Sequence, residues 1–198
     1  MSNKKILYAS TLLAIIIIVG GIAIFVSGKN TEPITIHSEG LWDVNVLNTT
    51  NLVKGSDVIV IGEVKEILPS RWTTTDGKRP VKIDDERIYT DFIIRVDEYL
   101  KNPQSTKEIT VRTLGGKVDD DSMIVEDEAE FKPNEKVLLF LTTEDPFTKN
   151  IGSEHLRVTG WVHGKFTIIN DQAIRPKLPQ EHRNIPLQEL IKSVNESK

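Results

Sequence analysis

The sequence predicts a mainly β fold, a Greek-key barrel or sandwich with one or two short helices, preceded by a single N-terminal transmembrane helix. Three observations lead to this prediction. An uncharged apolar segment opens the chain, about seven short strand-like segments follow it, and a helical amphipathic pattern closes it. The length of 198 residues is enough for one core with an appendage.

The segment from Ile6 to Val26 contains 21 residues, none of them charged, and is rich in Ile and Leu. A helix of this length spans roughly 31 Å, close to the hydrocarbon thickness of a bilayer. Lys4 and Lys5 precede it, so the positive-inside bias predicts a single-pass protein of the cell membrane, with residues 1–5 cytoplasmic and the C-terminal part outside. The alternative is a signal peptide cleaved near Ser27 to give a secreted form, although the long apolar core favours an uncleaved anchor.

The rest of the chain divides into a polar stalk over residues 27–40 and an extracytoplasmic domain over residues 41–198. Beyond residue 30 the chain has 22 basic and 29 acidic side chains, a net charge of −7. This charge argues against nucleic acid or an anionic lipid surface as a partner. The chain has no Cys, which excludes a disulfide framework, thiol catalysis and thiolate metal sites.

The strand-like segments differ in pattern. Val58–Ile61 and Val137–Leu141 are uninterrupted apolar runs, which predict strands covered on both faces, and Gly62 indicates a bulge or bend. Ile88–Leu100 and Ile109–Thr113 alternate between apolar and polar residues. Further strands are expected at Ser122–Glu126, Leu156–Val162, Lys165–Ile169 and Gln172–Ile174, with tight turns at His163-Gly164 and Asn170-Asp171.

Two helices and two long loops complete the predicted domain. A short helix is expected at Asn48–Lys54, with Asn48 or Thr49 as its N-cap. Pro186 suits the start of a C-terminal helix. The apolar side chains of this helix fall on one face that we expect to pack on the core: Leu187, Leu190, Ile191 and Val194. Arg71–Asp85 and Arg175–Arg183 are predicted to be loops.

Five of these segments follow one another in a familiar order: Asp57–Val64, Tyr89–Val96, Ile109–Thr113, Phe131–Leu141 and Gly160–Phe166. Their order resembles a bacterial extracytoplasmic domain of the superfamily that contains netrin modules and tissue inhibitors of metalloproteinases. The resemblance covers roughly residues 45–175. It implies an OB-like β-barrel, and fold alone does not confer function.

The resemblance does not extend to the inhibitory mechanism. Inhibitory members of that superfamily chelate the zinc of a protease through an N-terminal cysteine. This chain has no Cys, and its N-terminus belongs to the predicted membrane helix. A protease inhibitor or modulator that acts through its loops therefore stays open as an alternative function.

The densest acidic stretch, Asp119-Asp120-Asp121, is the candidate metal site. Calcium binds several carboxylate and carbonyl oxygens, which a loop of this composition can supply. The segment lacks the spacing of an EF-hand. A solvated hairpin loop after Gly115-Gly116 is the alternative interpretation.

Arg71 and Trp72 are the candidate binding residues. Trp72 lies in a polar loop, so we expect its side chain to be exposed and available to a partner, whereas Trp42 and Trp161 are expected in the core. OB-type barrels bind extended ligands across one face and its loops.

The sequence offers no catalytic motif and implies no cofactor. It contains no G-x-S-x-G elbow, no H-E-x-x-H pair and no phosphate-binding glycine loop. Ser153, Glu154 and His155 are adjacent, and adjacent strand residues point to opposite faces. These observations predict a non-enzymatic module that binds a protein or an envelope component, and they disfavour a hydrolase.

Overall fold

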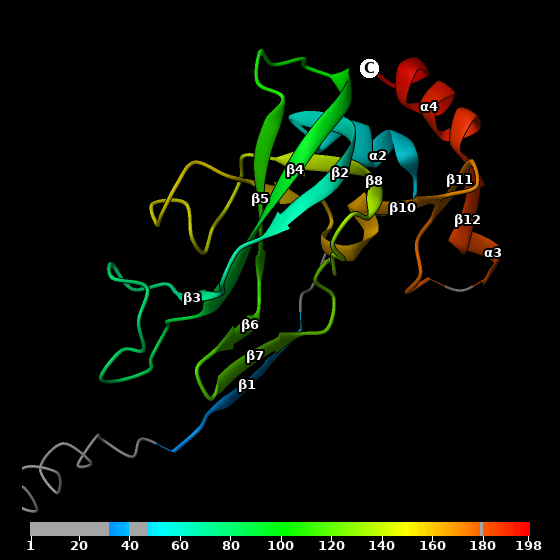
Figure 1. The fold of residues 1–198 in the computed structure, drawn as a ribbon. Helices are drawn as coiled ribbons and strands as arrows, with labels where there is room; N and C mark the ends of the chain where they lie inside the picture. The colour runs from blue at the N-terminus through cyan, green and yellow to red at the C-terminus, as the bar shows by residue number, and fades with distance from the viewer. Residues whose placement is uncertain (1–31, 40–46, 179) are drawn as a thin grey trace, which may run out of the picture. The chain divides into compact units, whose positions relative to one another are not determined.

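A computed structural model describes residues 32–39, 47–178 and 180–198 of the chain (Figure 1). The predicted membrane segment, Ile6 to Val26, and the predicted core residue Trp42 lie outside these residues. Within them, no helix combines the length and the hydropathy needed to cross a bilayer.

Five strands close into a barrel, which confirms the predicted mainly β class and gives it an OB-like topology. They are β2 (Val58–Ile67), β4 (Ile88–Lys101), β5 (Glu108–Leu114), β8 (Lys136–Thr142) and β9 (Leu156–Val158). The ring runs β2-β4-β5-β9-β8 and returns to β2. Its neighbours are antiparallel except for β5 and β9, which are parallel.

The barrel interior is filled by the inward-facing residues of these strands. Phe92 and Ile94 of β4 meet Val111 of β5 there, as the alternating sequence predicts. The register between β2 and β4 shifts at Gly62, so the predicted bulge is confirmed. A Cβ atom at Gly62 would lie 2.5 Å from the carbonyl oxygen of Arg95, so the close approach of the two strands requires glycine.

A second apolar layer covers one outer wall of the barrel and explains the uninterrupted apolar runs. Ile59, Leu138 and Phe140 face outward and pack against α2 (Thr49–Lys54) and α4 (Leu187–Glu196). Asn48 caps α2 by accepting a hydrogen bond from the Thr50 amide at 2.8 Å, as predicted. The predicted apolar stripe of the C-terminal helix lies in the same layer.

A small sheet stands at one end of the barrel, with strand order β1-β7-β6 (Figure 1). Its strands are β1 (Thr35–Ser38), β6 (Gly116–Val118) and β7 (Asp121–Val125). β3 (Arg71–Trp72) pairs with β4 nearby. β1 pairs in parallel with β7. Part of the segment predicted to be a stalk over residues 27–40 is therefore a sheet strand.

The predicted hairpin at His163-Gly164 is wrong. β9 ends at Val158, and a 3-10 helix, η1 (Trp161–Gly164), leads into β10 (Lys165–Ile169). β9 and β10 both pair with β8, β10 along its first half and β9 at its end. The chain must therefore cross from one part of β8 to the other, which a two-residue turn does not allow.

The remaining elements extend the sheet beyond β10. Asn170 and Asp171 adopt left-handed backbone angles in a tight turn into β11 (Gln172–Ile174), as predicted. β12 (Asn184–Pro186) pairs with β11. The predicted loop Arg175–Arg183 contains one short helix, α3 (Gln180–Arg183).

Candidate functional site

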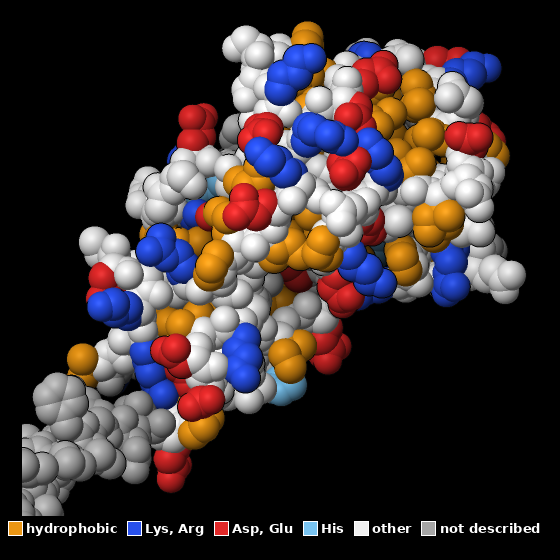
Figure 2. Space-filling view, in the orientation of Figure 1, with side chains coloured by type: hydrophobic (Ala, Val, Ile, Leu, Met, Phe, Trp, Pro, Cys, Tyr) orange, Lys and Arg blue, Asp and Glu red, His pale blue; other side chains and the backbone are white. Residues whose placement is uncertain are grey.

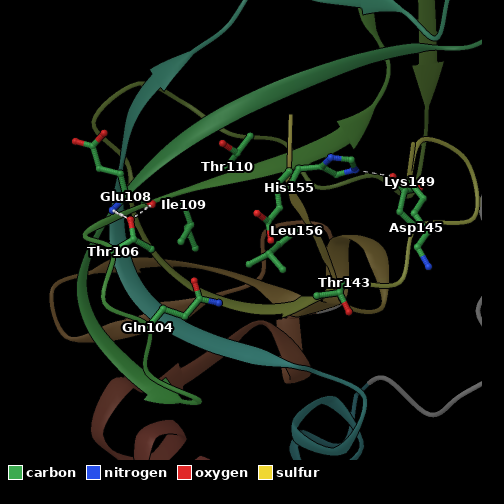
Figure 3. Close-up of a pocket in the computed structure, with 11 residues that line it drawn as sticks. Gln104, Thr106, Glu108, Ile109, Thr110, Thr143, Asp145, Lys149, His155 and Leu156 are labelled. Carbon is green, nitrogen blue, oxygen red and sulfur yellow. Dashed lines mark hydrogen bonds and ion pairs between the residues drawn. The ribbon is translucent and has the colours of Figure 1, made fainter. Parts of the chain in front are cut away.

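An open groove of about 480 Å³ lies between β5 and the loop that connects β8 to β9 (Figure 3). One side is formed by the start of β5 and the preceding β4–β5 connection, which contribute Gln104, Thr106, Glu108 and Thr110. The opposite side is the 143–155 loop. Both sides are polar, and the buried side chains of Ile109 and Leu156 lie between them.

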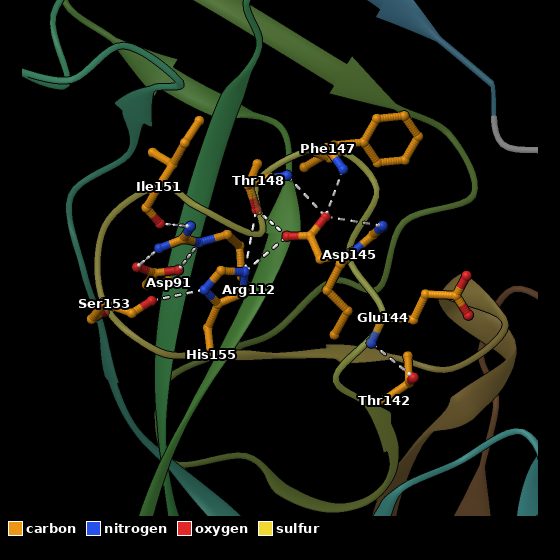
Figure 4. A network of polar contacts seen from close by, with 12 residues as sticks. Asp91, Arg112, Thr142, Glu144, Asp145, Phe147, Thr148, Ile151, Ser153 and His155 are labelled. Atoms are coloured by element: carbon orange, nitrogen blue, oxygen red, sulfur yellow. Dashed lines mark hydrogen bonds and ion pairs between the residues drawn. The ribbon is translucent and has the colours of Figure 1, made fainter.

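A buried ion pair holds the 143–155 loop against the barrel wall (Figure 4). Arg112 on β5 donates from Nε and Nη2 to both carboxylate oxygens of Asp91 on β4, at 2.6 and 2.8 Å. Its third nitrogen, Nη1, donates to the carbonyl oxygen of Ile151 in the loop at 2.6 Å. Arg112 is 1% exposed, and its guanidinium lies 3.9 Å from the ring centre of Tyr89.

Gly152 fits this contact because its backbone is left-handed, with a φ of 71°. A Cβ atom there would lie 2.9 Å from Nη2 of Arg112. Any residue with a Cβ atom at position 152 would therefore hold the loop farther from the Arg112 guanidinium.

Asp145 organises the interior of the same loop (Figure 4). Its carboxylate accepts hydrogen bonds from the amides of Phe147 and Thr148 at 2.9 and 3.0 Å, and also from the Thr148 hydroxyl. Nε2 of His155 lies 2.8 Å from Oδ2 of Asp145. Burial alone would raise the pKa of Asp145, but the hydrogen bonds from His155, Thr148 and these amides outweigh it and hold the pKa well below its usual range.

Both ring nitrogens of His155 face oxygen acceptors. Nδ1 lies 2.8 Å from the Ser153 carbonyl oxygen, which only accepts, and Nε2 faces the Asp145 carboxylate. The Thr148 hydroxyl and His155 contact the same oxygen of Asp145. The Thr148 hydroxyl also lies 3.3 Å from Nε2 of His155, which is the nitrogen that faces Asp145. A proton relay from a nucleophile through histidine to an acid needs a different ring nitrogen for each partner, so the trio lacks that order.

Arg157 on β9 connects this loop to a second buried carboxylate. Its Nη1 lies 3.7 Å from Asp145, and its Nη2 donates to Glu128 at 3.4 Å. Glu128 is 5% exposed and also accepts a hydrogen bond from the Leu114 amide at 3.1 Å. Burial raises the pKa of Glu128 to about 7, although Arg157 and the amides of Leu114 and Ala129 oppose this shift.

The shift at Glu128 predicts a pH dependence of stability. Between pH 4.5 and about 7 the folded state keeps a proton on Glu128 that the unfolded state has lost, so the free energy of unfolding falls as the pH rises through this window. The full effect is at most about 3 kcal/mol. We expect Glu128→Gln to remove this component, so that its melting temperature declines less than that of the natural protein from pH 4.5 to 8. Parallel melting curves across that window would contradict the assignment.

Charges of both signs surround the groove. Glu108 pairs with Lys65 at 2.7 Å on an exposed surface, which contributes little to stability. Lys149 and Glu154 are exposed, and neither forms an ion pair within the described part of the chain. On the face of the molecule that Figure 2 presents, basic and acidic side chains are also interspersed and do not gather by sign.

The predicted exposure of Trp72 is wrong. Its side chain is fully buried, at 0% exposure, in a small core with Ile88 and Met123 under the β1-β7-β6 sheet. Pairing of β3 with β4 turns the indole ring inward. Trp72 is therefore buried even though its neighbours in the sequence are polar. Arg71 is exposed, and neither residue lines the groove. Trp161, predicted in the core, is half-buried and packs under the guanidinium of Arg157.

The three aspartates of the candidate calcium site are not gathered around one point. Asp119 and Asp120 are exposed in the β6–β7 turn, whereas Asp121 is buried and forms an ion pair with Arg79 at 3.0 Å. No group of three or more His, Asp or Glu side chains suited to a metal occurs among residues 32–39, 47–178 and 180–198. The Arg79–Asp121 pair does bring the Arg71–Asp85 segment against this turn, as a structural contact.

Sequence reasoning missed the groove. Ser153, Glu154 and His155, interpreted from the sequence as strand residues, lie in the 143–155 loop, and Glu154 and His155 line the groove. The other groove residues come from segments that carry no catalytic or binding motif. Asp145-Pro146-Phe147-Thr148 is the one local signal, since an aspartate followed by proline and threonine favours a turn closed by its own side chain. The partners of Arg112 are distant in sequence, since Asp91 lies 21 residues before it and Ile151 lies 39 residues after it. Their meeting depends on the barrel.

No protein-family model and no curated protein matches this sequence.

Proposed function

We propose that this protein is a non-enzymatic binding module, anchored in the cell membrane by Ile6 to Val26, that holds a protein or envelope partner in the groove outside the cytoplasm. The observation that carries the proposal is the groove itself, an open polar cleft with one wall built on barrel strands and the other fixed by buried charges. A site held by rigid elements loses little conformational entropy when a ligand binds.

The chemistry of the groove favours binding over catalysis. The histidine at its edge, His155, uses both nitrogens in contacts within the loop. Asp145 accepts its hydrogen bonds from the same loop and is not directed at an open reaction centre. The groups left exposed are amide, hydroxyl and charged side chains, which recognise a partner by hydrogen bonds and ion pairs.

The proposed membrane location is supported by the sequence, whose charge-free segment has the length of a bilayer span. The acidic character of the remaining chain favours a partner with basic groups. A kinship with the superfamily of netrin modules and metalloproteinase inhibitors is proposed on the order of its strand segments, in keeping with the OB-like ring.

Site-specific photo-cross-linking in the native membrane tests the groove. A photoreactive amino acid replaces Gln104 at the groove edge, and a matched one replaces Lys192, which is exposed on α4. We expect a discrete adduct from position 104 and none from position 192. Equal adducts from both positions, or none from either, would contradict the proposal.

A further inference from the structure

Resting on the proposed function, we infer that the groove binds an extended polypeptide segment, which adds as a strand to the uncovered edge of β5 at Glu108–Thr110. The segment is mostly polar and carries a basic side chain. The inference follows from three features of the groove: the direction of the β5 backbone, the hydroxyl that contacts it, and the charge beside it.

The edge of β5 is only partly covered. The Val96 amide donates to the Lys107 carbonyl oxygen at 2.8 Å, so β4 and β5 hydrogen-bond at Lys107. In an antiparallel ladder the next residue points its backbone groups the other way, so the amide and carbonyl of Glu108, and then those of Thr110, face away from β4. On that side β9 pairs with Val111 and Arg112, and no described strand pairs with Glu108 or Ile109.

A side chain occupies the place of the missing strand. The Thr106 hydroxyl donates to the Glu108 carbonyl oxygen at 2.6 Å and accepts from the Glu108 amide at 3.2 Å (Figure 3). A residue of an added antiparallel strand makes this same pair of hydrogen bonds. Thr106 is exposed, so rotation of its side chain toward solvent would release both backbone groups to a ligand.

The chemistry of the edge selects a polypeptide. Paired backbone donors and acceptors at strand spacing match a peptide backbone, as in other cases of strand addition. Glu154 lies exposed across the groove, and within the described residues it forms no ion pair, so it offers a site for a lysine or arginine of the ligand. A polysaccharide would use the side chains and leave the strand edge unpaired.

The test uses the full-length protein in detergent micelles and a display library of random ten-residue linear peptides. An enriched peptide is synthesised and its affinity measured by fluorescence anisotropy. We expect Thr106→Val to bind it about threefold to tenfold more tightly, because the competing hydroxyl is gone. Thr74→Val is the matched control, since its hydroxyl also makes local hydrogen bonds but lies outside the groove, and its affinity should be unchanged.

A second variant removes a donor from the edge. Thr110→Pro deletes an amide that points away from β4, a position where a strand tolerates proline, and we expect at least a tenfold loss of affinity. Hydrogen exchange should show that the peptide protects the amides of Glu108 and Thr110. Affinity unmoved by Thr106→Val together with exchange unchanged at both amides would overturn the inference, whether or not Thr110→Pro folds.

The outcomes separate this inference from the proposed function. An adduct from position 104 with no enriched peptide would leave the groove as a binding site and exclude strand addition, which points to a glycan or a folded surface. Loss of both the adduct and the peptide would remove the proposed function together with the inference.

Discussion

Replacing Arg112 by methionine is expected to destabilise the fold by about 3–5 kcal/mol, because it leaves the buried carboxylate of Asp91 without its partner. The change also removes the hydrogen bond to the Ile151 carbonyl oxygen, so the 143–155 loop loses its attachment to β5. Chemical denaturation of the full-length protein in micelles, followed by tryptophan fluorescence, measures the loss.

Two further variants make this result specific. Lys82→Met breaks an ion pair between exposed side chains and should change stability by less than about 0.5 kcal/mol. The double variant Asp91→Leu/Arg112→Met removes both buried charges and should regain most of the lost stability. If the Arg112→Met protein were as stable as the Lys82→Met protein, the Arg112–Asp91 ion pair would not stabilise the fold.

Asp145→Ala is expected to release the 143–155 loop and to cost about 3 kcal/mol. The change leaves the amides of Phe147 and Thr148 without their carboxylate acceptor and removes the Asp145 contact of His155. Arg157 loses one of the two carboxylates that it contacts and keeps Glu128. Lys149 lies exposed in this loop, so trypsin provides the readout. We expect cleavage after Lys149 to become at least about tenfold faster, because a tenfold rise in the open population corresponds to about 1.4 kcal/mol.

Asp84→Ala is the matched control, since Asp84 pairs with Lys82 on an open surface. It should leave cleavage at Lys149 unchanged. Equal cleavage rates for the natural protein and Asp145→Ala would mean that the carboxylate does not organise the loop.

The sequence predicts the barrel strands well because their patterns are local. The uninterrupted runs at Val58–Ile61 and Val137–Leu141 do lie between two apolar layers. The alternation within Ile88–Leu100 separates the barrel interior from an exposed face only over Ile94–Asp97, whereas residues 88–92 are buried whichever way they point. The glycine at position 62 does coincide with a register shift. In each case the side chains within the segment itself determine where the strand lies.

The site is not predictable in the same way. Asp91 and Arg112 are charged residues in alternating strands, and such residues ordinarily face solvent. They are buried because a loop from residues 143–155 folds over them, and nothing local to either strand indicates that cover. Trp72 is an apolar residue for which the local pattern also misleads. Its sequence neighbours are polar, but the pairing of β3 with β4 directs its side chain into a small core.

The central claim is that the groove exists before any partner binds, because buried charges hold the 143–155 loop in place. Hydrogen exchange of the free full-length protein tests this most directly. We predict that the amides of Phe147, Thr148 and Ile151 exchange nearly as slowly as those of β5, since each is hydrogen-bonded within the loop. Exchange of these three amides as fast as that of the exposed residues Val81 and Lys82 would contradict the account.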